Sequence, residues 1–388
     1  MIPLPLLFPS VPMPLELPAC QASAFEVALT GDLMMHQSQL ASASQLDGSI
    51  DFMGTLDGVS DVLQSATVTA GNLETPVGAP DVVFNDEYLG FNAPHEYLLP
   101  IRAAGFDVLQ TMNNHTLDRY GDGVDSTLDA VWSQQMRTVG TYRTALDRDE
   151  GWALVQVDGA RVGFLAYGEM DPAAADAELN ARINMVEPKS RLLDDVRRAR
   201  AHADVLIVGV HWGEEYELVE RERQRSLARQ IIEAGADVVW GTHPHVLQPA
   251  EVLTVPSEFG SRDGLVLYSL GNFISGQTSF PRDGGVIVRL DAAACGGRGW
   301  LTGVRFAPTW VDRTDRLGRL SYRVLLTSES DAGCRDNDMT DADCKRMHSL
   351  HDQAARQLPS AQFDSEPGQP AWEPPFRIGS LSWPWMQL

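Results

Sequence analysis

Five of the nine histidines in this sequence stand at or just beyond the end of a short apolar run. They are His36, His115, His211, His243 and His245. Carboxylate or amide side chains follow the same kind of run at Asp32, Glu74, Asn114 and Asn272. Imidazole nitrogens combined with such oxygen donors are typical ligands of divalent metals in hydrolytic sites. Each residue alone also fits a turn, a helix cap or a core position, but their concentration at run ends favours a metal site.

The donor set suits a centre with two divalent cations. Such a pair, about 3.5–4 Å apart, needs a bridging carboxylate, neutral imidazoles and further oxygen ligands, with positions open for water and a substrate oxygen. The sequence offers these ligands at Asp32, Glu74, Asn114, His211, His243 and His245. A metal-bound hydroxide would attack phosphorus or an acyl carbon, and His115 would protonate the leaving group. Mn, Fe, Zn and Mg all suit such mixed sites to some degree.

The elements that must position these residues alternate between strands and helices. Seven short β-rich runs lie between Phe25 and Phe273: "FEVALTGD", "ATVTAGNLE", "FDVLQTMNNH", "ARVGFLAYGEM", "ADVLIVGVHWGEEY", "ADVVWGTHPH" and "GLVLYSLGNF". Helices are expected at 93–104, 124–137, 188–202 and 220–234. This alternation predicts a layered α/β fold. Binding groups collect beyond the carboxyl ends of strands in such sheets, so the donors are expected to converge there.

Composition divides the chain into four segments. Residues 1–24 form an apolar, proline-rich leader or tail, 25–290 an α/β domain with the metal donors, 291–356 a strand-rich extension, and 357–388 a C-terminal strap. After Gly285, strand patterns follow one another without long helices, so this part is expected to extend or flank the sheet.

The N-terminal segment lacks the basic residues of a secretory signal and is therefore an incomplete export signal. Its length and its prolines argue against a membrane-spanning helix, which needs about 20 apolar residues. "LPAC", which ends at Cys20, resembles a bacterial lipoprotein cleavage site. A lipid anchor at Cys20 is one interpretation, and a plain tail is the other.

Cys334 and Cys344 lie in a polar stretch without apolar periodicity. A disulfide between them would hold this stretch in shape, would contribute about 3 kcal/mol in the chain-entropy model, and would indicate an oxidising compartment. The alternative is two free surface thiols. His348 and His351 are spaced for a metal pair on a helix, but an exposed helix face is the better interpretation.

Charge and motifs exclude several function classes. The net charge of −23 at pH 7 repels nucleic-acid phosphates and anionic lipid headgroups. The sequence contains no G-x-S-x-G elbow, P-loop or dinucleotide fingerprint, so neither a serine hydrolase nor nucleotide-driven chemistry is indicated. Arginine-rich runs at 197–200 and 220–225 would form either a basic patch or, as we favour, helix faces paired with Glu and Asp.

Six motifs occur in a fixed order between about Glu26 and Leu290: "GDLMMH", "GNLETP", "NNHTLDRYGDGVDSTLDAV", "HWGEEYE", "GADVVWGTHPHVLQP" and "YSLGNF". Together they resemble the CapA-type proteins of bacterial poly-γ-glutamate capsule synthesis, which are similar to calcineurin-like metallophosphatases. The resemblance implies a metallophosphatase-like four-layer α/β/β/α sandwich with a dimetal centre at its strand ends. The strand-rich C-terminal part would extend this fold.

The resemblance also implies individual roles. One metal would be held by Asp32 and His245, Glu74 would bridge, and the second metal would be held by Asn114, His211 and His243. His115 would be the acid or a substrate-stabilising imidazole. Glu215 matches a carboxylate characteristic of the CapA group and would orient His211 or touch substrate.

The sequence departs from the metallophosphatase pattern at two ligand positions. Met34 stands where a histidine is usual, so His36 would either substitute from further along or remain unused. Glu74 stands where the bridging residue is usually aspartate. Both departures weaken the expected ligation of the first metal.

Two functional hypotheses follow. The first is an exported, divalent-metal-dependent hydrolase of a phosphoester or of a γ-glutamyl or other envelope polymer bond. The second is a non-catalytic protein that binds or guides an anionic envelope polymer in the same cleft. Either protein would lie at the periplasmic or extracytoplasmic face of the envelope, and capsule synthesis membrane proteins would be its partners.

Overall fold

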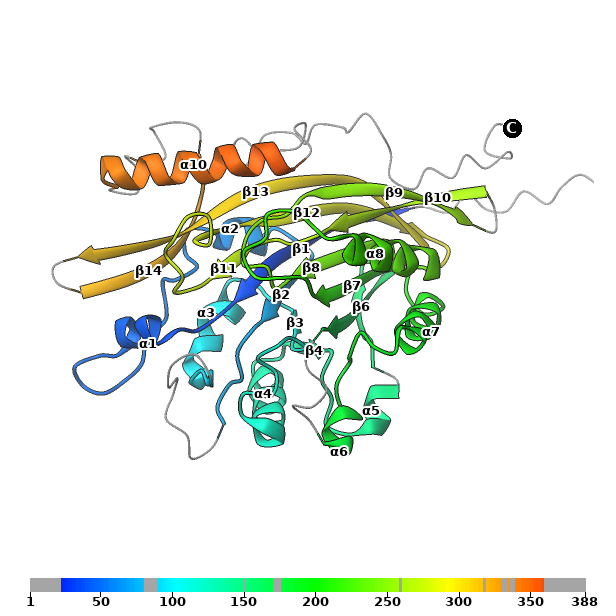
Figure 1. Ribbon diagram of the computed structural model, residues 1–388, viewed down its shortest axis with the longest axis horizontal. Coiled ribbons are helices and arrows are strands. Elements are labelled where there is room, and N and C mark those ends of the chain that lie inside the picture. The colour runs from blue at the N-terminus through cyan, green and yellow to red at the C-terminus, as the bar shows by residue number, and fades with distance from the viewer. Residues whose placement is uncertain are drawn as a thin grey trace, which may run out of the picture.

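The computed structural model describes residues 22–79, 90–149, 151–169, 176–257, 260–316, 319–328, 334 and 339–358. Cys20, which was considered as a lipid anchor, and most of the C-terminal strap lie outside these residues. Two β-sheets face each other in the described part of the chain (Figure 1).

The first sheet contains the strand that carries Asp32. Its order is β14 (Arg319–Leu326), β13 (Arg298–Arg316), β12 (Gly284–Cys295), β1 (Ser23–Leu33), β2 (Val68–Leu73), β3 (Val108–Gln110) and β4 (Arg137–Val139), and β11 (Asn272–Ile274) also pairs with β1. Strands β1 to β4 are parallel, so their carboxyl ends lie at one edge.

The second sheet carries the histidine-rich strand ends. Its order is β5 (Ala153–Val157), β6 (Ala160–Gly168), β7 (Val205–His211), β8 (Val238–Thr242), β10 (Gly260–Leu267) and β9 (Ala250–Ser257). Strands β6, β7, β8 and β10 are parallel neighbours. Their carboxyl ends therefore also share an edge.

Successive side chains of a strand point to opposite faces of its sheet, so the apolar residues form three separate layers. In β7, Val205 and Ile207 belong to the core between the two sheets, while Leu206 and Val208 face outward. The outward residues of the second sheet pack against α7 (Lys189–Arg200) and α8 (Glu222–Ala234). Burial on both faces explains why these strands are almost continuously apolar.

Helices cover the outer face of the first sheet in the same way. They are α1 (Gln37–Ala43), α2 (Ser60–Gln64), α3 (Leu98–Ala103), which follows the 3₁₀ turn η1 (His95–Tyr97), and α4 (Tyr120–Ser133). Two short helices, α5 (Ala145–Asp149) and α6 (Ala177–Asn180), precede and follow the β5–β6 hairpin. The layers therefore run helices, sheet, sheet, helices, and the predicted α/β/β/α sandwich is confirmed.

Some elements differ from the sequence interpretation. The run "GLVLYSLGNF" does not form one strand: its first half ends β10 in the second sheet, and its last residues begin β11, which pairs with β1 in the first. Gly271, with φ 70°, lies at this crossing. The short strands β4 and β5 and the strand β9 were not anticipated, because they are short or half-exposed.

The C-terminal strands continue the first sheet rather than flanking it. β12 pairs antiparallel with β1, and β13 and β14 follow in antiparallel order. A division of the chain after residue 290 falls inside β12. No helix in the described ranges is long and apolar enough to cross a bilayer.

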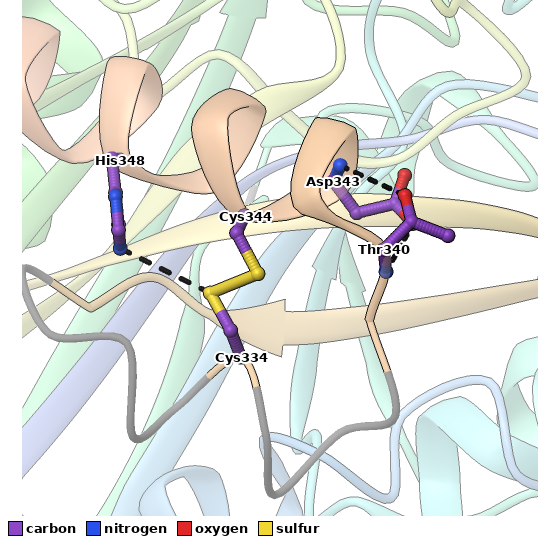
Figure 2. Close-up of a disulfide and its surroundings, with 5 residues drawn as sticks. All are labelled: Cys334, Thr340, Asp343, Cys344 and His348. Carbon is purple, nitrogen blue, oxygen red and sulfur yellow. Dashed lines mark hydrogen bonds between the residues drawn. A yellow bond between two sulfur atoms is a disulfide. The ribbon is translucent and has the colours of Figure 1, made fainter.

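The long helix α10 (Asp341–Gln357) lies across β13 in Figure 1. Cys334 and Cys344 form a disulfide at its N-terminal end, so the polar stretch is tied to the helix rather than left with free thiols (Figure 2). Cys295 is disulfide-bonded as well. The expectation that His351 is exposed was wrong: it is buried, and its Nδ1 lies 3.1 Å from Thr327 Oγ1, because α10 packs against the sheet.

Candidate metal centre

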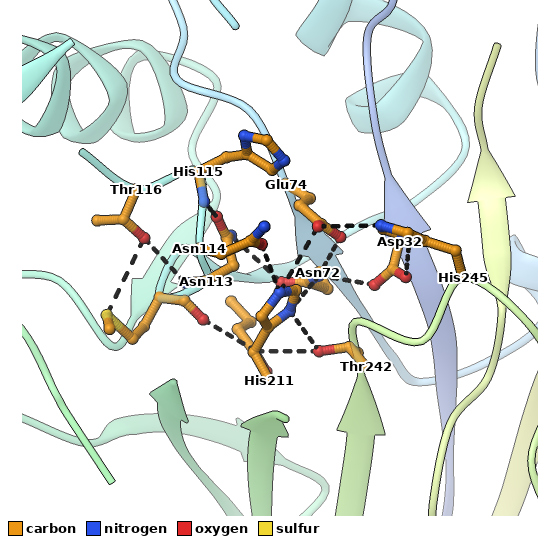
Figure 3. A network of polar contacts seen from close by, with 12 residues as sticks. Asp32, Asn72, Glu74, Asn113, Asn114, His115, Thr116, His211, Thr242 and His245 are labelled. Atoms are coloured by element: carbon orange, nitrogen blue, oxygen red, sulfur yellow. Dashed lines mark hydrogen bonds and ion pairs between the residues drawn. The ribbon is translucent and has the colours of Figure 1, made fainter. Parts of the chain in front are cut away.

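The two sheets bring the predicted donors to one place, with oxygen donors from the first and imidazoles from the second (Figure 3). Asp32 lies near the end of β1, Glu74 follows β2, and Asn114 follows β3. His211 ends β7, and His243 and His245 follow β8. These side chains, which follow different strands in the sequence, thus form a single polar cluster where the carboxyl edges of the two sheets meet.

Two groups of three ligand atoms form within this cluster. In one, atoms of Asp32, Glu74 and His245 lie within 4.8 Å of one another, and in the other the same holds for Glu74, His211 and His243. Glu74 belongs to both groups. Its Oε1 lies 3.5 Å from His211 Nε2 and 3.6 Å from His245 Nε2. A carboxylate in this position is placed to bridge two cations.

Further contacts define the edges of the two groups. His245 Nδ1 lies 3.0 Å from Asp32 Oδ2. Asn114 Oδ1 lies 2.8 Å from His211 Nε2, so the predicted amide oxygen joins the second group. The rings of His211 and His243 lie 4.6 Å apart between centroids.

Burial controls the charge of these side chains. Burial, followed by the neighbouring Asp32 carboxylate, raises the pKa of Glu74 well above its ordinary value. Burial, followed by the nearby imidazoles of His243 and His245, lowers the pKa of His211 well below its ordinary value. Burial and His245 likewise lower the pKa of His243 to about 4. The imidazoles of His211 and His243 are therefore neutral near pH 7, which is the form that binds a metal.

Two buried polar atoms in this cluster have no hydrogen-bond partner among the residues that the structure describes. They are Glu74 Oε1 and His243 Nδ1. Buried polar side-chain atoms are normally satisfied, and both atoms belong to side chains of the group formed with His211. A bound cation would satisfy such atoms, so the residues present fit a divalent metal.

The backbone at the two histidines after β8 is unusual. His243 has φ 100° and His245 has φ 58°, in a region that residues other than glycine rarely occupy. Such conformations persist at functional sites when surrounding contacts hold them. Gly241, in β8 just before these histidines, allows the backbone at Tyr268 to lie close to the strand, because a Cβ there would lie 2.0 Å from the carbonyl oxygen of Tyr268.

Two supporting residues were missed by the sequence analysis. Asn72 Nδ2 donates to Asp32 Oδ1 at 2.7 Å and to Glu74 Oε2 at 3.2 Å, so one amide holds both carboxylates. Thr242 Oγ1 lies 3.0 Å from His211 Nδ1, and this contact leaves Nε2 directed at Glu74. The two-residue strand period that puts Asn72 on the face of Glu74 could have indicated the first.

His115 lies at the border of the cluster. Its Nδ1 is 2.9 Å from Asp118 Oδ2, and its ring makes an edge contact with Phe91 at 4.4 Å between centroids. After burial and the two nearer imidazoles, His115 also contributes to the lowered pKa of His211. His115 is thus near the candidate ligands without belonging to either group of three.

Other candidates take different positions. His36 Nδ1 accepts a hydrogen bond from Gly276 N–H at 3.0 Å, and His36 belongs to neither ligand group. Asn272 Nδ2 donates to the carbonyl oxygen of Arg282. Glu215 is exposed, and the hydrogen-bond partners of the His211 ring among described residues are Thr242, Asn72 and Asn114.

Residues 26–277 match the model of the bacterial capsule synthesis protein family PGA_cap. The chain belongs to this family. PGA_cap belongs to the metallophosphatase-like superfamily, which agrees with the two-sheet architecture. The family assignment confirms the resemblance drawn from the ordered motifs.

Two curated relatives of this chain come from Bacillus. The chain is 29% identical over 220 residues to the PGA biosynthesis protein CapA of Bacillus subtilis (strain 168), a match that covers 56% of each chain. It is 31% identical over 226 residues to the capsule biosynthesis protein CapA of Bacillus anthracis, covering 56% of this chain and 53% of the relative. The matches thus span only a little over half of each relative.

Two solved structures from Thermus thermophilus align with this PGA_cap chain at 15% identity and a TM-score of 0.41. One is a hypothetical protein, of which 98% aligns with 73% of this chain. The other is a 5'-nucleotidase precursor, of which 59% aligns with 86% of this chain.

Proposed function

We propose that this protein is a divalent-metal-dependent hydrolase that cleaves a γ-glutamyl amide or a phosphoester during synthesis or export of a capsule polymer. The observation that supports this most is the pair of candidate ligand groups that share Glu74, in which Glu74 Oε1 and His243 Nδ1 have no hydrogen-bond partner within the described ranges. Asp32 and His245 would hold one metal, and Asn114, His211 and His243 the other. Bound metals would supply an activated water and polarise the scissile group.

The remaining residues would move protons and contact substrate. Asp118 engages His115 Nδ1, so Nε2 is the ring nitrogen left to donate a proton to the leaving group. Glu215 is exposed, yet after burial and Asp32 its charge also raises the pKa of Glu74. A carboxylate that is both exposed and close to the ligands is placed to contact substrate.

The first test is elemental analysis of the full chain after loading with Mn, Zn or Fe. We expect about two metals per chain in the parent and nearly none in Glu74→Gln, which keeps the side-chain size. Glu178→Gln removes the same charge at an exposed helical position and should retain both metals. A parent with no bound metal under all three conditions contradicts the proposal.

A second candidate, a non-catalytic binder of the anionic polymer, is favoured by one observation. His36 Nδ1 accepts a hydrogen bond from Gly276 N–H, and Met34 is apolar, so neither adds to the candidate ligands Asp32, Glu74 and His245 found among the described residues. A first metal held weakly by this group would favour binding over catalysis. His115→Asn separates the candidates. A hydrolase loses turnover of chromogenic γ-glutamyl amides or phosphodiesters in this variant but keeps its metals; a binder has no turnover to lose.

We place the protein at the periplasmic or extracytoplasmic face of the envelope, with capsule synthesis membrane proteins as partners. The disulfide between Cys334 and Cys344 and the disulfide-bonded Cys295 support an oxidising compartment. Fractionation of the native host followed by thiol labelling under denaturing conditions tests this. Labelling of these cysteines without prior reduction would contradict it.

A further inference from the structure

A guanidinium lies beside the candidate metal centre, stacked on an aromatic ring. The Cζ of Arg282 is 3.4 Å from the centroid of the Tyr216 ring. The Tyr216 ring in turn lies 6.1 Å, between centroids, from that of His245. None of the roles proposed above uses Arg282 or Tyr216.

Backbone hydrogen bonds fix both residues to the segments that carry ligands. Tyr216 N–H donates at 2.8 Å to the carbonyl oxygen of Pro244, the residue between the two histidines after β8. The carbonyl oxygen of Arg282 accepts from Asn272 Nδ2 at 2.7 Å, and Asn272 pairs in register with Asp32. The stacked pair is therefore positioned by both sheets.

Arg282 differs from the arginines of the two arginine-rich runs in its ion pairing. The arginine-rich runs are neutralised by carboxylates, as predicted: Arg197 by Asp194, Arg198 by Asp195, Arg200 by Asp237, Arg221 by Glu214, Arg223 by Glu169 and Arg225 by Glu220. Within the described ranges, no carboxylate forms an ion pair with Arg282. This holds although Glu214, Glu215 and Glu217 flank Tyr216 in the sequence.

A cation that has no acidic partner in the described part of the chain is notable in a protein with a net charge of −23. Stacking holds the guanidinium plane over the ring and leaves its N–H groups in that plane free to donate. A carboxylate accepts two such N–H groups in a bidentate pair. The Tyr216–Arg282 pair is therefore a preformed carboxylate-binding element next to the candidate metals.

We propose that Arg282, stacked on Tyr216, binds an α-carboxylate of a γ-linked glutamate chain whose amide bond lies at the metal centre. This rests on the proposed function and assigns the residue pair that would recognise its substrate. In a γ-linked chain, an α-carboxylate is attached to the carbon that carries each amide nitrogen. Every amide presented to the metals therefore has a carboxylate beside it, which a fixed guanidinium can bind.

The test is equilibrium binding of a short γ-linked glutamate oligomer and of its α-methyl ester to the Mn-loaded full chain. We expect the parent to prefer the free acid, and Arg282→Gln to weaken free-acid binding about tenfold or more while leaving ester binding unchanged. Arg197→Gln removes an arginine from the outer helix α7 and should bind as the parent does.

Two further variants test the stacking. Tyr216→Phe keeps the ring and should keep the affinity, while Tyr216→Leu removes it and should weaken free-acid binding in the same direction as Arg282→Gln. Unchanged free-acid binding by Arg282→Gln, or a parent that binds no free-acid oligomer, overturns the inference. Metal content is measured in parallel: a parent without metal but with the Arg282 effect refutes the hydrolase and leaves the carboxylate site standing.

Discussion

The first sheet and the second sheet contribute chemically opposite halves to the same edge. From the first come the oxygen donors of Asp32, Glu74 and Asn114, and from the second come the imidazoles of His211, His243 and His245. Burial raises the pKa of Glu74 and lowers the pKa of His211 and His243. Both shifts favour the neutral side chains, because a buried charge without a counterion is costly.

These opposite shifts give the metal-free protein opposite pH dependences in its two halves. The folded Glu74 keeps a proton that the unfolded chain releases above the ordinary pKa of 4.5, so this half loses stability as the pH rises from there toward the raised value. In the folded protein, His243 stays neutral at pH values just below 6.5, where the unfolded chain binds a proton at this residue. The second half therefore loses stability as the pH falls from 6.5 to about 4. Cations of charge +2 would stabilise the charged carboxylate and bind the neutral imidazoles.

The largest effect is expected from removing the residue that both groups share. Glu74→Gln should abolish binding of both metals and yet stabilise the metal-free protein at neutral pH, by about 1.4 kcal/mol for each unit of raised pKa. Thermal unfolding of metal-stripped parent and variant between pH 5 and 8 measures this. The difference in unfolding free energy between variant and parent should grow with pH. A variant that is less stable than the parent at every pH would show that burial of the Glu74 carboxylate does not destabilise the metal-free protein.

The donors themselves were predictable because they directly follow apolar runs. A run such as "ADVVWGTHPH" must leave the core where its polar residues begin, and parallel strands bring those points to one edge. The same rule found Asp32, Glu74 and His211. It required no knowledge of which strands are neighbours.

The supporting residues were less accessible from sequence. Thr242 faces His211 from the neighbouring strand β8, and the pairing of β7 with β8 is visible only in the folded sheet. Tyr216 and Arg282 lie in loops 66 positions apart in the numbering. They meet because both loops are hydrogen-bonded to segments that carry candidate ligands. "GLVLYSLGNF" was read as one strand because its apolar pattern continues across Gly271, where the chain passes between sheets.

The second effect concerns only the imidazole half. Asparagine tolerates positive φ, so His243→Asn should fold while removing one ligand of the group with His211. We expect metal content to fall from about two to about one per chain. Stability of the metal-free variant should fall less between pH 6.5 and 4 than that of the parent, by up to about 3 kcal/mol. Asp32→Asn is the counterpart in the oxygen half and should remove the other metal.

Elemental analysis combined with acid unfolding separates these two variants. If His243→Asn retains two metals, His243 is not a ligand and the unpartnered Nδ1 has another explanation. If metal-free His243→Asn loses as much stability as the parent between pH 6.5 and 4, then His211 rather than His243 dominates the proton uptake of this half.

The smallest effect tests whether the imidazole half depends on its hydrogen-bonded support. Thr242→Val keeps the side-chain shape but removes the oxygen that lies 3.0 Å from His211 Nδ1. Without this oxygen, Asn72 Nδ2, a donor 3.3 Å from His211 Nδ1, favours the tautomer protonated on Nε2, so affinity for one metal should fall about 10- to 100-fold while the group with Asp32 keeps its own. Thr254→Val, at an exposed position of β9, is the matched control. Competitive titration with a chromogenic chelator resolves the two metal affinities. If Thr242→Val lowers both affinities equally, the two metal sites are coupled through the shared Glu74.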